Sequence, residues 1–413
     1  MHILTLLFLG AALASLALTL WLARRHAAHV LAHRAQVPTE FAGSIDLAAH
    51  QRAADYTVAR TRLGMLEAVI DTSVLLALTL GGGLQLIASA LGDMRAGYAR
   101  ELALIAALTA VLGLAGLPFT WHRTFGIEAR FGFNQMTRRL FVADAIKGVL
   151  LGAALGVPLV LAILWFIDSS GDMWWLYAWI AYCAFQLLVL FLFPTVIMPL
   201  FNKFTPLQEG TLKSAIESLL TRCGFRAGGL FVMDGSKRSR HSNAFFSGFG
   251  AAKRIVLFDT LIQKLAHKEI EAVLAHELGH FRHKHIIKRI AMAFAVSLAF
   301  FALLGYLMDQ SWFFAGLGVG SASPAMALIL LALALPVFTF MLTPLLSRSS
   351  RKHEFEADAY AAQQTSASDL IAALTKIYND NAATLTPDPL HSAFYDSHPP
   401  AFIRIGRLKG LSP

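Results

Sequence analysis

The chain has 413 residues, of which 56% are hydrophobic and only 15% are charged, and its mean hydropathy is positive. An ordinary soluble domain carries about 25% charged residues, so the composition predicts an integral membrane protein. The formal net charge of +9 would suggest a nucleic-acid partner for a soluble protein, but basic residues of membrane proteins collect on cytoplasmic loops. We therefore expect no nucleic-acid partner. The two cysteines, Cys183 and Cys223, are far apart and predict no disulfide framework.

Seven apolar stretches are long enough to cross a bilayer, which takes about 20 helical residues. They are Ile3–Ala23, Val69–Leu91, Leu102–Phe119, Gly148–Ile167, Trp174–Ile197, Ile290–Met308 and Pro324–Leu346. No small-residue cleavage site follows the first stretch, so we expect a retained anchor. Glu67, Asp71, Gln85 and Gln186 lie in or beside the second and fifth stretches, where they could serve helix contacts or line a wet interior.

Lysine and arginine are distributed unequally between the two sides of these stretches. Of the 35 such residues, all but Arg95 and Arg100 fall on one side. Because positive residues stay inside, we expect the N-terminus outside and both the segment 199–289 and the C-terminal tail in the cytoplasm.

The segment 199–289 has a soluble composition and follows the fifth stretch. Prolines in Pro199–Leu207 predict an irregular connector. The patterns that follow predict a helix over Glu209–Cys223, a strand over Gly229–Met233, and a hairpin of Asn243–Phe249 with Arg254–Phe258. The free edge of such a sheet could hold an extended peptide by backbone hydrogen bonds, although a small stabilising hairpin would give the same pattern.

An H-E-x-x-H sequence lies near the end of this segment, within a predicted helix from His267 to Arg289. His276 and His280 are four residues apart and share one helix face, which lets two imidazoles reach one zinc ion. Glu277 would lie beside the metal, where a carboxylate can take a proton from metal-bound water. A solvated helix face could carry the same five residues by chance.

A catalytic zinc ion takes three protein ligands and leaves one position for water, so a third ligand is needed. The nearby candidates are His283, His285 and Glu271, but the two histidines fall off the face that the H-E-x-x-H histidines share. We interpret them as solvated residues or as outer partners of the ligands.

A better candidate lies beyond the last apolar stretch. Glu354 and Asp358 are four residues apart on one helical face, while Glu356 points elsewhere. Such a helix could bring one carboxylate to the metal and a second to a ligand imidazole. An ordinary charged helix face is the alternative. Further along, His398 precedes two prolines, which hold it in an extended or turn conformation; it could face a substrate carbonyl or simply lie in a loop.

Together these motifs resemble the type I CAAX prenyl endopeptidases, integral-membrane zinc proteases of the gluzincin class. The resemblance covers nearly the whole chain and includes Ile127–Asn134, Pro199–Phe204, Asp234–Ser239, His241–Ala244, Arg254–Leu261 and Ser397–Pro400. It implies a mainly α fold, in which seven spanning helices form a barrel around a water-filled chamber. A gluzincin-like zinc protease domain with a small β-sheet would cap that barrel.

The resemblance also implies roles for single residues. The matched positions are the zinc ligands His276, His280 and Glu354 for one Zn²⁺ per chain, the catalytic base Glu277, the carboxylate Asp358 that we expect to orient His276, Asn243 beside the strand that holds the substrate, and His398 and Arg404 near the cleft. We expect His398 to stabilise the oxyanion.

We therefore expect a membrane region over residues 1–198, a metalloprotease segment over 199–289, two further spans over 290–346, and a C-terminal segment over 347–413 that completes the protease domain. The expected activity is hydrolysis of peptide bonds near the C-terminus of CAAX-type substrates, with or without a prenyl group, by a monomer. A quality-control protease of broader specificity and a non-enzymatic zinc-stabilised scaffold are the alternatives.

Two features distinguish the chain from the eukaryotic members of the family it resembles. Its loops on the outer side are short, and the C-terminal Gly410–Pro413 carries no ER-retrieval signal. These features suggest a bacterial relative in an inner membrane.

Overall fold

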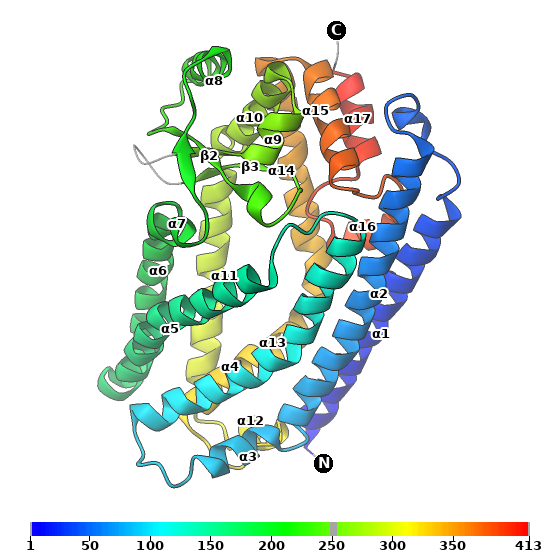
Figure 1. Cartoon of the computed structure of the whole chain (residues 1–413). Coiled ribbons are helices and arrows are strands. Elements are labelled where there is room, and N and C mark those ends of the chain that lie inside the picture. The colour runs from blue at the N-terminus through cyan, green and yellow to red at the C-terminus, as the bar shows by residue number, and fades with distance from the viewer. Residues whose placement is uncertain (1, 248–253, 412–413) are drawn as a thin grey trace.

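The computed structural model describes residues 2–247 and 254–411 and shows a mainly helical molecule with one small sheet (Figure 1). The expected hairpin turn, residues 250–253, and the strand end at 248–249 lie outside the described residues. The N-terminus lies at the opposite end of the molecule from the sheet and the C-terminus, as an odd number of spans requires.

Among the described residues, six helices, and a seventh span if a bent pair is counted as one, are long and apolar enough to cross a membrane. They are α1 (Ile3–Ala32), the pair α2 (Leu47–Leu78) and α3 (Gly83–Ala90), α4 (Tyr98–Trp121), α5 (Arg138–Ser169), α6 (Trp174–Leu192), α11 (His285–Leu307) and α13 (Pro324–Thr339). The predicted seven-span fold is thereby confirmed.

The second span differs from the expected continuous helix over Val69–Leu91. Helix α2 begins at Leu47 and ends at Leu78, and α3 continues at an angle of 55°. Three consecutive glycines start at Gly81; they favour a helix poorly, and Gly82 adopts a left-handed φ of 77°. In α3, Gln85 Oε1 accepts hydrogen bonds from the backbone N–H groups of Gly320 and Ser321, which assigns this side chain to a loop contact.

Two other polar side chains noted in the spans also have partners. Glu67 forms an ion pair with Arg123, and Gln186 Nε2 donates to the hydroxyl of Tyr182 at 2.6 Å.

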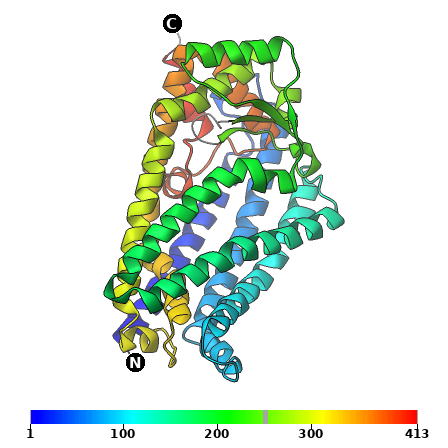
Figure 2. The same ribbon diagram turned by 90° about the vertical axis from the view of Figure 1, so that its left-hand side faces the viewer.

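The spanning helices form a closed ring (Figures 1 and 2). Around it, each helix packs on the next in the order α1, α2, α4, α5, α6, α11, α13 and back to α1. An apolar core joins the helices at the end that holds α3 and α12 (Ser311–Gly316), with Leu104, Ile163, Ala178 and Leu304 buried there. Nearer the sheet, residues 139–162, 179–192 and 286–300 contain no buried side chain. The described side chains of the ring are therefore closely packed at one end and more exposed towards the other.

In the part of the chain that the structure describes, the sheet has four strands in the order β1-β2-β4-β3. They are β1 (Phe204–Pro206), β2 (Leu230–Met233), β3 (Ala244–Ser247) and β4 (Arg254–Phe258). The described part of the hairpin pairs antiparallel as predicted, with Ala244 opposite Leu257. Strand β2 runs parallel to β4, and β1 antiparallel to β2. The connector is therefore less irregular than expected, because it contains β1 and the short helix α7 (Met198–Phe201).

The remaining α-helices of the described residues are α8 (Thr211–Arg222), α9 (Asp259–Lys264), α10 (His267–Arg282), α14 (Thr343–Gln364), α15 (Ala367–Asp380), α16 (Pro389–Tyr395) and α17 (Ala401–Lys409). Helix α8 confirms the predicted helix there. The helix expected to run unbroken to Arg289 instead breaks at Lys284, whose φ is 57°. Helix α14 follows α13 through one short 3₁₀ turn, Phe340–Leu342. Helices α10 and α14 are therefore extensions of the sixth and seventh spans.

Candidate metal centre

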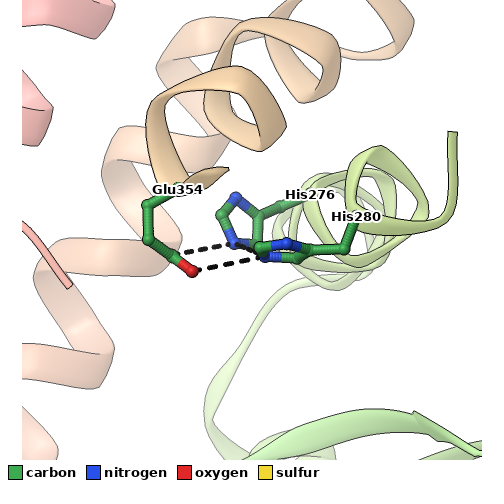
Figure 3. A group of neighbouring side chains, drawn as sticks. All are labelled: His276, His280 and Glu354. Atoms are coloured by element: carbon green, nitrogen blue, oxygen red, sulfur yellow. Dashed lines mark hydrogen bonds and ion pairs between the residues drawn. The ribbon is translucent and has the colours of Figure 1, made fainter. Parts of the chain in front are cut away.

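Three ligand-type side chains converge where α10 packs against α14 (Figure 3). His276 Nε2 lies 3.4 Å from Glu354 Oε2, His280 Nε2 lies 3.3 Å from Glu354 Oε1, and the two imidazole nitrogens are 3.3 Å apart. Each side chain offers one ligand atom, and these atoms lie within 4.8 Å of one another. All three residues are buried.

The close approach of the two helices depends on Gly279. A Cβ atom at this position would lie 2.8 Å from Ala357 Cα and 3.1 Å from its carbonyl oxygen. Between two helices that meet at a glycine and an alanine, His280 on one and Glu354 on the other can reach a common point.

The donor set suits a metal ion. Glu354 Oε2 is buried and has no hydrogen-bond partner among the described residues, and two ring nitrogens face the same carboxylate. Two histidines with one glutamate are the protein ligands of a known class of catalytic zinc site, which leaves an open position for water or substrate. The residues present therefore fit a bound metal.

Asp358 holds His276 from its other side. Its Oδ1 lies 2.8 Å from His276 Nδ1, so the imidazole can donate there and present an unprotonated Nε2 to Glu354 and His280. Burial disfavours charge on His276, but the nearby carboxylates of Asp358 and Glu354 outweigh it and raise the pKa of His276 to about 9.

Arg404 comes from α17 and is only 5% exposed. Its Nε and Nη2 donate to Asp358 at 2.9 and 2.6 Å, and its Nη1 lies 3.8 Å from Glu354 Oε2. The guanidinium is engaged by Asp358, although it also lines the adjoining cavity. The structure thus places Arg404 chiefly as support for the carboxylate behind His276, and its expected contact with substrate stays a prediction.

Glu277 faces a cavity of about 350 Å³ beside the three ligands, which Asn243, Tyr378 and His398 also line. Burial raises the pKa of Glu277, and a more basic carboxylate is a better proton acceptor. The side chain of His398 is 61% exposed at the rim, with its Nε2 3.5 Å from Glu354 Oε2. Asn243 immediately precedes the edge strand β3.

The candidates near the H-E-x-x-H sequence lie apart from the convergence point. His283 and Glu271 are not part of the ligand cluster, and His283 is exposed. His285 is fully buried, with Nδ1 3.0 Å from His280 Nδ1. It touches a ligand from behind, which matches the interpretation of an outer partner.

Sequence reasoning missed a network that holds the loop before β3. His241 lies 3.3 Å from Glu128 and 3.2 Å from Asn381, whose Oδ1 also accepts from the backbone N–H of Ser242 at 3.0 Å. Tyr56 donates to the same Glu128 carboxylate. Two of these residues fall within motifs of the family resemblance, Glu128 in Ile127–Asn134 and His241 in His241–Ala244, whereas nothing in the sequence marks Asn381.

Comparison with known proteins gives consistent matches over the chain. Residues 26–203 match a family model described as CAAX prenyl protease N-terminal, five membrane helices, and residues 206–412 match peptidase family M48. A rice protein described as CAAX prenyl protease 1 homolog is 39% identical over 75% of this chain and 73% of its own. The CAAX prenyl protease 1 of Saccharomyces cerevisiae is 36% identical over 76% of this chain and 73% of its own length. A human CAAX prenyl protease 1 homolog is 33% identical over 76% of this chain and 74% of its own length.

The crystal structure of S. mikatae Ste24p is similar over 99% of both chains, with a TM-score of 0.89 and 30% identity. These relatives are eukaryotic, so they give no support to the expected bacterial source, which stays a prediction.

Proposed function

The chain belongs to peptidase family M48 and is a membrane metalloendopeptidase, and from this premise we propose that it is a zinc enzyme that cleaves prenylated CAAX-type substrates near their C-terminus. The observation that carries the proposal is the convergence of His276, His280 and Glu354 next to a cavity that holds Glu277. The names of the relatives support the substrate class.

In this proposal His276, His280 and Glu354 hold one Zn²⁺, which when bound polarises the scissile carbonyl and lowers the pKa of a water molecule. Glu277 takes the proton of the attacking water and returns it to the leaving amine nitrogen. His398, at the rim of the cavity, donates a hydrogen bond to the carbonyl oxygen as negative charge develops there. Asp358 holds His276 in the tautomer that leaves Nε2 free.

We propose that the substrate lies along β3. This strand is an edge of the sheet, since β4 is its single partner among the described strands, and an extended peptide can pair with such an edge. Asn243 and Ala244 line the cavity beside Glu277, so a peptide antiparallel to β3 would pass the ligands. The side chain of Asn243 would then contact the bound backbone.

We further propose that residues 199–289 and 347–413 form one cytoplasmic catalytic unit and that the spans position it at the membrane. The charge distribution of the loops supports this orientation. All proposed catalytic groups come from one chain, which supports a monomer as the active form.

Glu277→Gln tests the mechanism. The amide cannot accept the proton of water, so kcat on a farnesylated CAAX peptide should fall by about 10²- to 10⁴-fold, while bound zinc stays at the parent level. Glu271→Gln, on the same helix but outside the ligand cluster, is the matched control. Full activity of Glu277→Gln would end the proposed role of this residue.

The substrate class is tested separately with farnesylated peptide, the same peptide without the lipid, and casein. Faster cleavage of the farnesylated peptide supports the proposal. Equal cleavage of all three would instead favour the broader quality-control activity, and no chelator-sensitive cleavage of any would favour a non-enzymatic scaffold.

A further inference from the structure

The two histidine ligands are supported from behind by different groups. Nδ1 of His276 faces the carboxylate of Asp358, whereas Nδ1 of His280 faces a second histidine, His285, and no carboxylate of the described residues. His285 is 0% exposed, begins α11 directly after the break at Lys284, and stacks on His353 of α14 with ring centroids 4.0 Å apart.

If His280 and His285 are both neutral and His280 binds a metal through Nε2, only one placement of their ring protons satisfies the hydrogen bonds. His280 Nε2 faces Glu354 and His276, so as a metal ligand it carries no proton, and the proton of a neutral ring then resides on Nδ1. That Nδ1 lies 3.0 Å from His285 Nδ1, which must accept and therefore be unprotonated. His285 then carries its proton on Nε2 and donates it to Glu356 at 2.8 Å.

We propose that Glu356 and His285 are positioning residues that hold His280 in the metal-binding tautomer, an inference that rests on the proposed zinc site. Glu356 fixes the proton of His285 on Nε2, His285 accepts from His280 Nδ1, and His280 Nε2 is left free for the metal. Each ligand histidine is thereby oriented by a carboxylate. Asp358 contacts His276 directly, whereas Glu356 acts on His280 through the imidazole of His285.

The same geometry distinguishes a positioning role of His285 from that of a fourth metal ligand and from that of a residue that only fills space. His285 is not a fourth ligand, because its Nδ1 contacts the nitrogen of His280 that points away from Glu354 and His276. A residue that only fills space would need neither hydrogen bond, so a phenylalanine of similar size would replace it without loss of metal affinity.

The first test measures Zn²⁺ affinity of the full-length protein by competition with a fluorescent chelator at fixed pH. His285→Phe keeps the ring but cannot accept a hydrogen bond, and should bind Zn²⁺ about 10- to 100-fold more weakly than the parent. His285→Asn places an amide oxygen near the position of Nδ1 and should stay within about threefold of the parent. His283→Phe, an exposed histidine two residues earlier, is the matched control and should leave affinity unchanged.

A second pair of variants tests the role of Glu356 without altering a fully buried side chain. The side chain of Glu356 is 31% exposed, so substitutions there should fold. Glu356→Gln and Glu356→Met remove the same charge, but only the glutamine keeps an oxygen that accepts from His285 Nε2. The methionine variant should bind Zn²⁺ more weakly than the glutamine variant.

Parent affinity for His285→Phe, or equal affinity of the two Glu356 variants, would overturn the inference. So would an asparagine variant as weak as the phenylalanine variant. A parent protein that binds no Zn²⁺ would instead overturn the proposed metal centre, so the two failures are distinguishable.

Discussion

At the scale of single residues, the negative charge of Asp358 next to His276 is balanced by the guanidinium of Arg404. Asp358 and Arg404 are both buried, and two hydrogen bonds join them. The pair lets a carboxylate orient His276 without leaving an uncompensated negative charge beside the metal site. Removal of one partner of such a pair costs far more than the pair itself contributes, because the other charge stays buried.

Arg404→Met should therefore lower the free energy of unfolding by about 3–5 kcal/mol and also weaken Zn²⁺ binding, because Asp358 loses the contacts that hold it. Arg407→Met, one turn later on the same helix, removes an exposed guanidinium that stacks on Phe355 and should cost about 0.5–1 kcal/mol. Denaturant unfolding and chelator competition measure the two effects. Equal losses in both variants would contradict the special role of the buried pair.

The local geometry of the site could be predicted where it follows helix periodicity. His276 with His280, and Glu354 with Asp358, each share a face because the residues are four apart within one helix, although α10 ends at Arg282 and not at the expected Arg289. The sequence left His285 as either a solvated residue or an outer partner of a ligand, and it did not indicate His280 as that partner, because the contact depends on a left-handed residue at Lys284. The contact of Arg404 with Asp358 joins residues 46 positions apart, which no local pattern indicates.

At the scale of elements, the separation of α10 and α14 determines whether three ligand atoms can meet one ion. Gly279 faces Ala357, and a Cβ atom at Gly279 would lie so close to the Ala357 backbone that one of the helices would have to shift. The sequence contains this glycine within the H-E-x-x-H motif, but its packing partner is visible only in the folded molecule.

Gly279→Ala should push α10 away from α14, cost about 1–3 kcal/mol of stability through overpacking, and reduce Zn²⁺ affinity. Gly406→Ala is the control, because a Cβ there meets nothing within 4 Å and alanine favours a helix over glycine by about 1 kcal/mol. Thermal unfolding and zinc titration of both proteins test this expectation. An alanine at 279 that leaves zinc affinity intact would show that the helix separation is not critical.

In the sheet, local sequence patterns predict some of the strands but not how distant strands pair. The hairpin strands were predictable because both are apolar or β-branched and adjacent in sequence. The parallel pairing of β2 with β4 and the strand within the proline-containing connector were not, because both arise from contacts distant in sequence.

At the scale of the whole molecule, the loops and termini divide into two ends. The loop between α3 and α4 lies at the end of the N-terminus, and α17 lies at the other (Figure 1). Residues Asp93 and Lys409 are exposed at these two ends.

The proposed orientation predicts opposite labelling of these positions in sealed cells. In a background where Cys183 and Cys223 are replaced by serine, Asp93→Cys should react with a membrane-impermeant thiol reagent from outside. Lys409→Cys should react only after the membrane is opened, because positive loops stay inside. The reverse pattern would invert the topology and place the metal site outside.

The continuity of α13 with α14, and the near continuity of α11 with α10, has a mechanical consequence. Helices α11 and α13 are neighbours in the membrane ring. Helices α10 and α14, which carry the candidate ligands, adjoin them. Spanning helices adjust their tilt to the thickness of the bilayer. A change in bilayer thickness that altered the tilt of α11 and α13 would therefore also reach α10 and α14, which carry His276, His280 and Glu354.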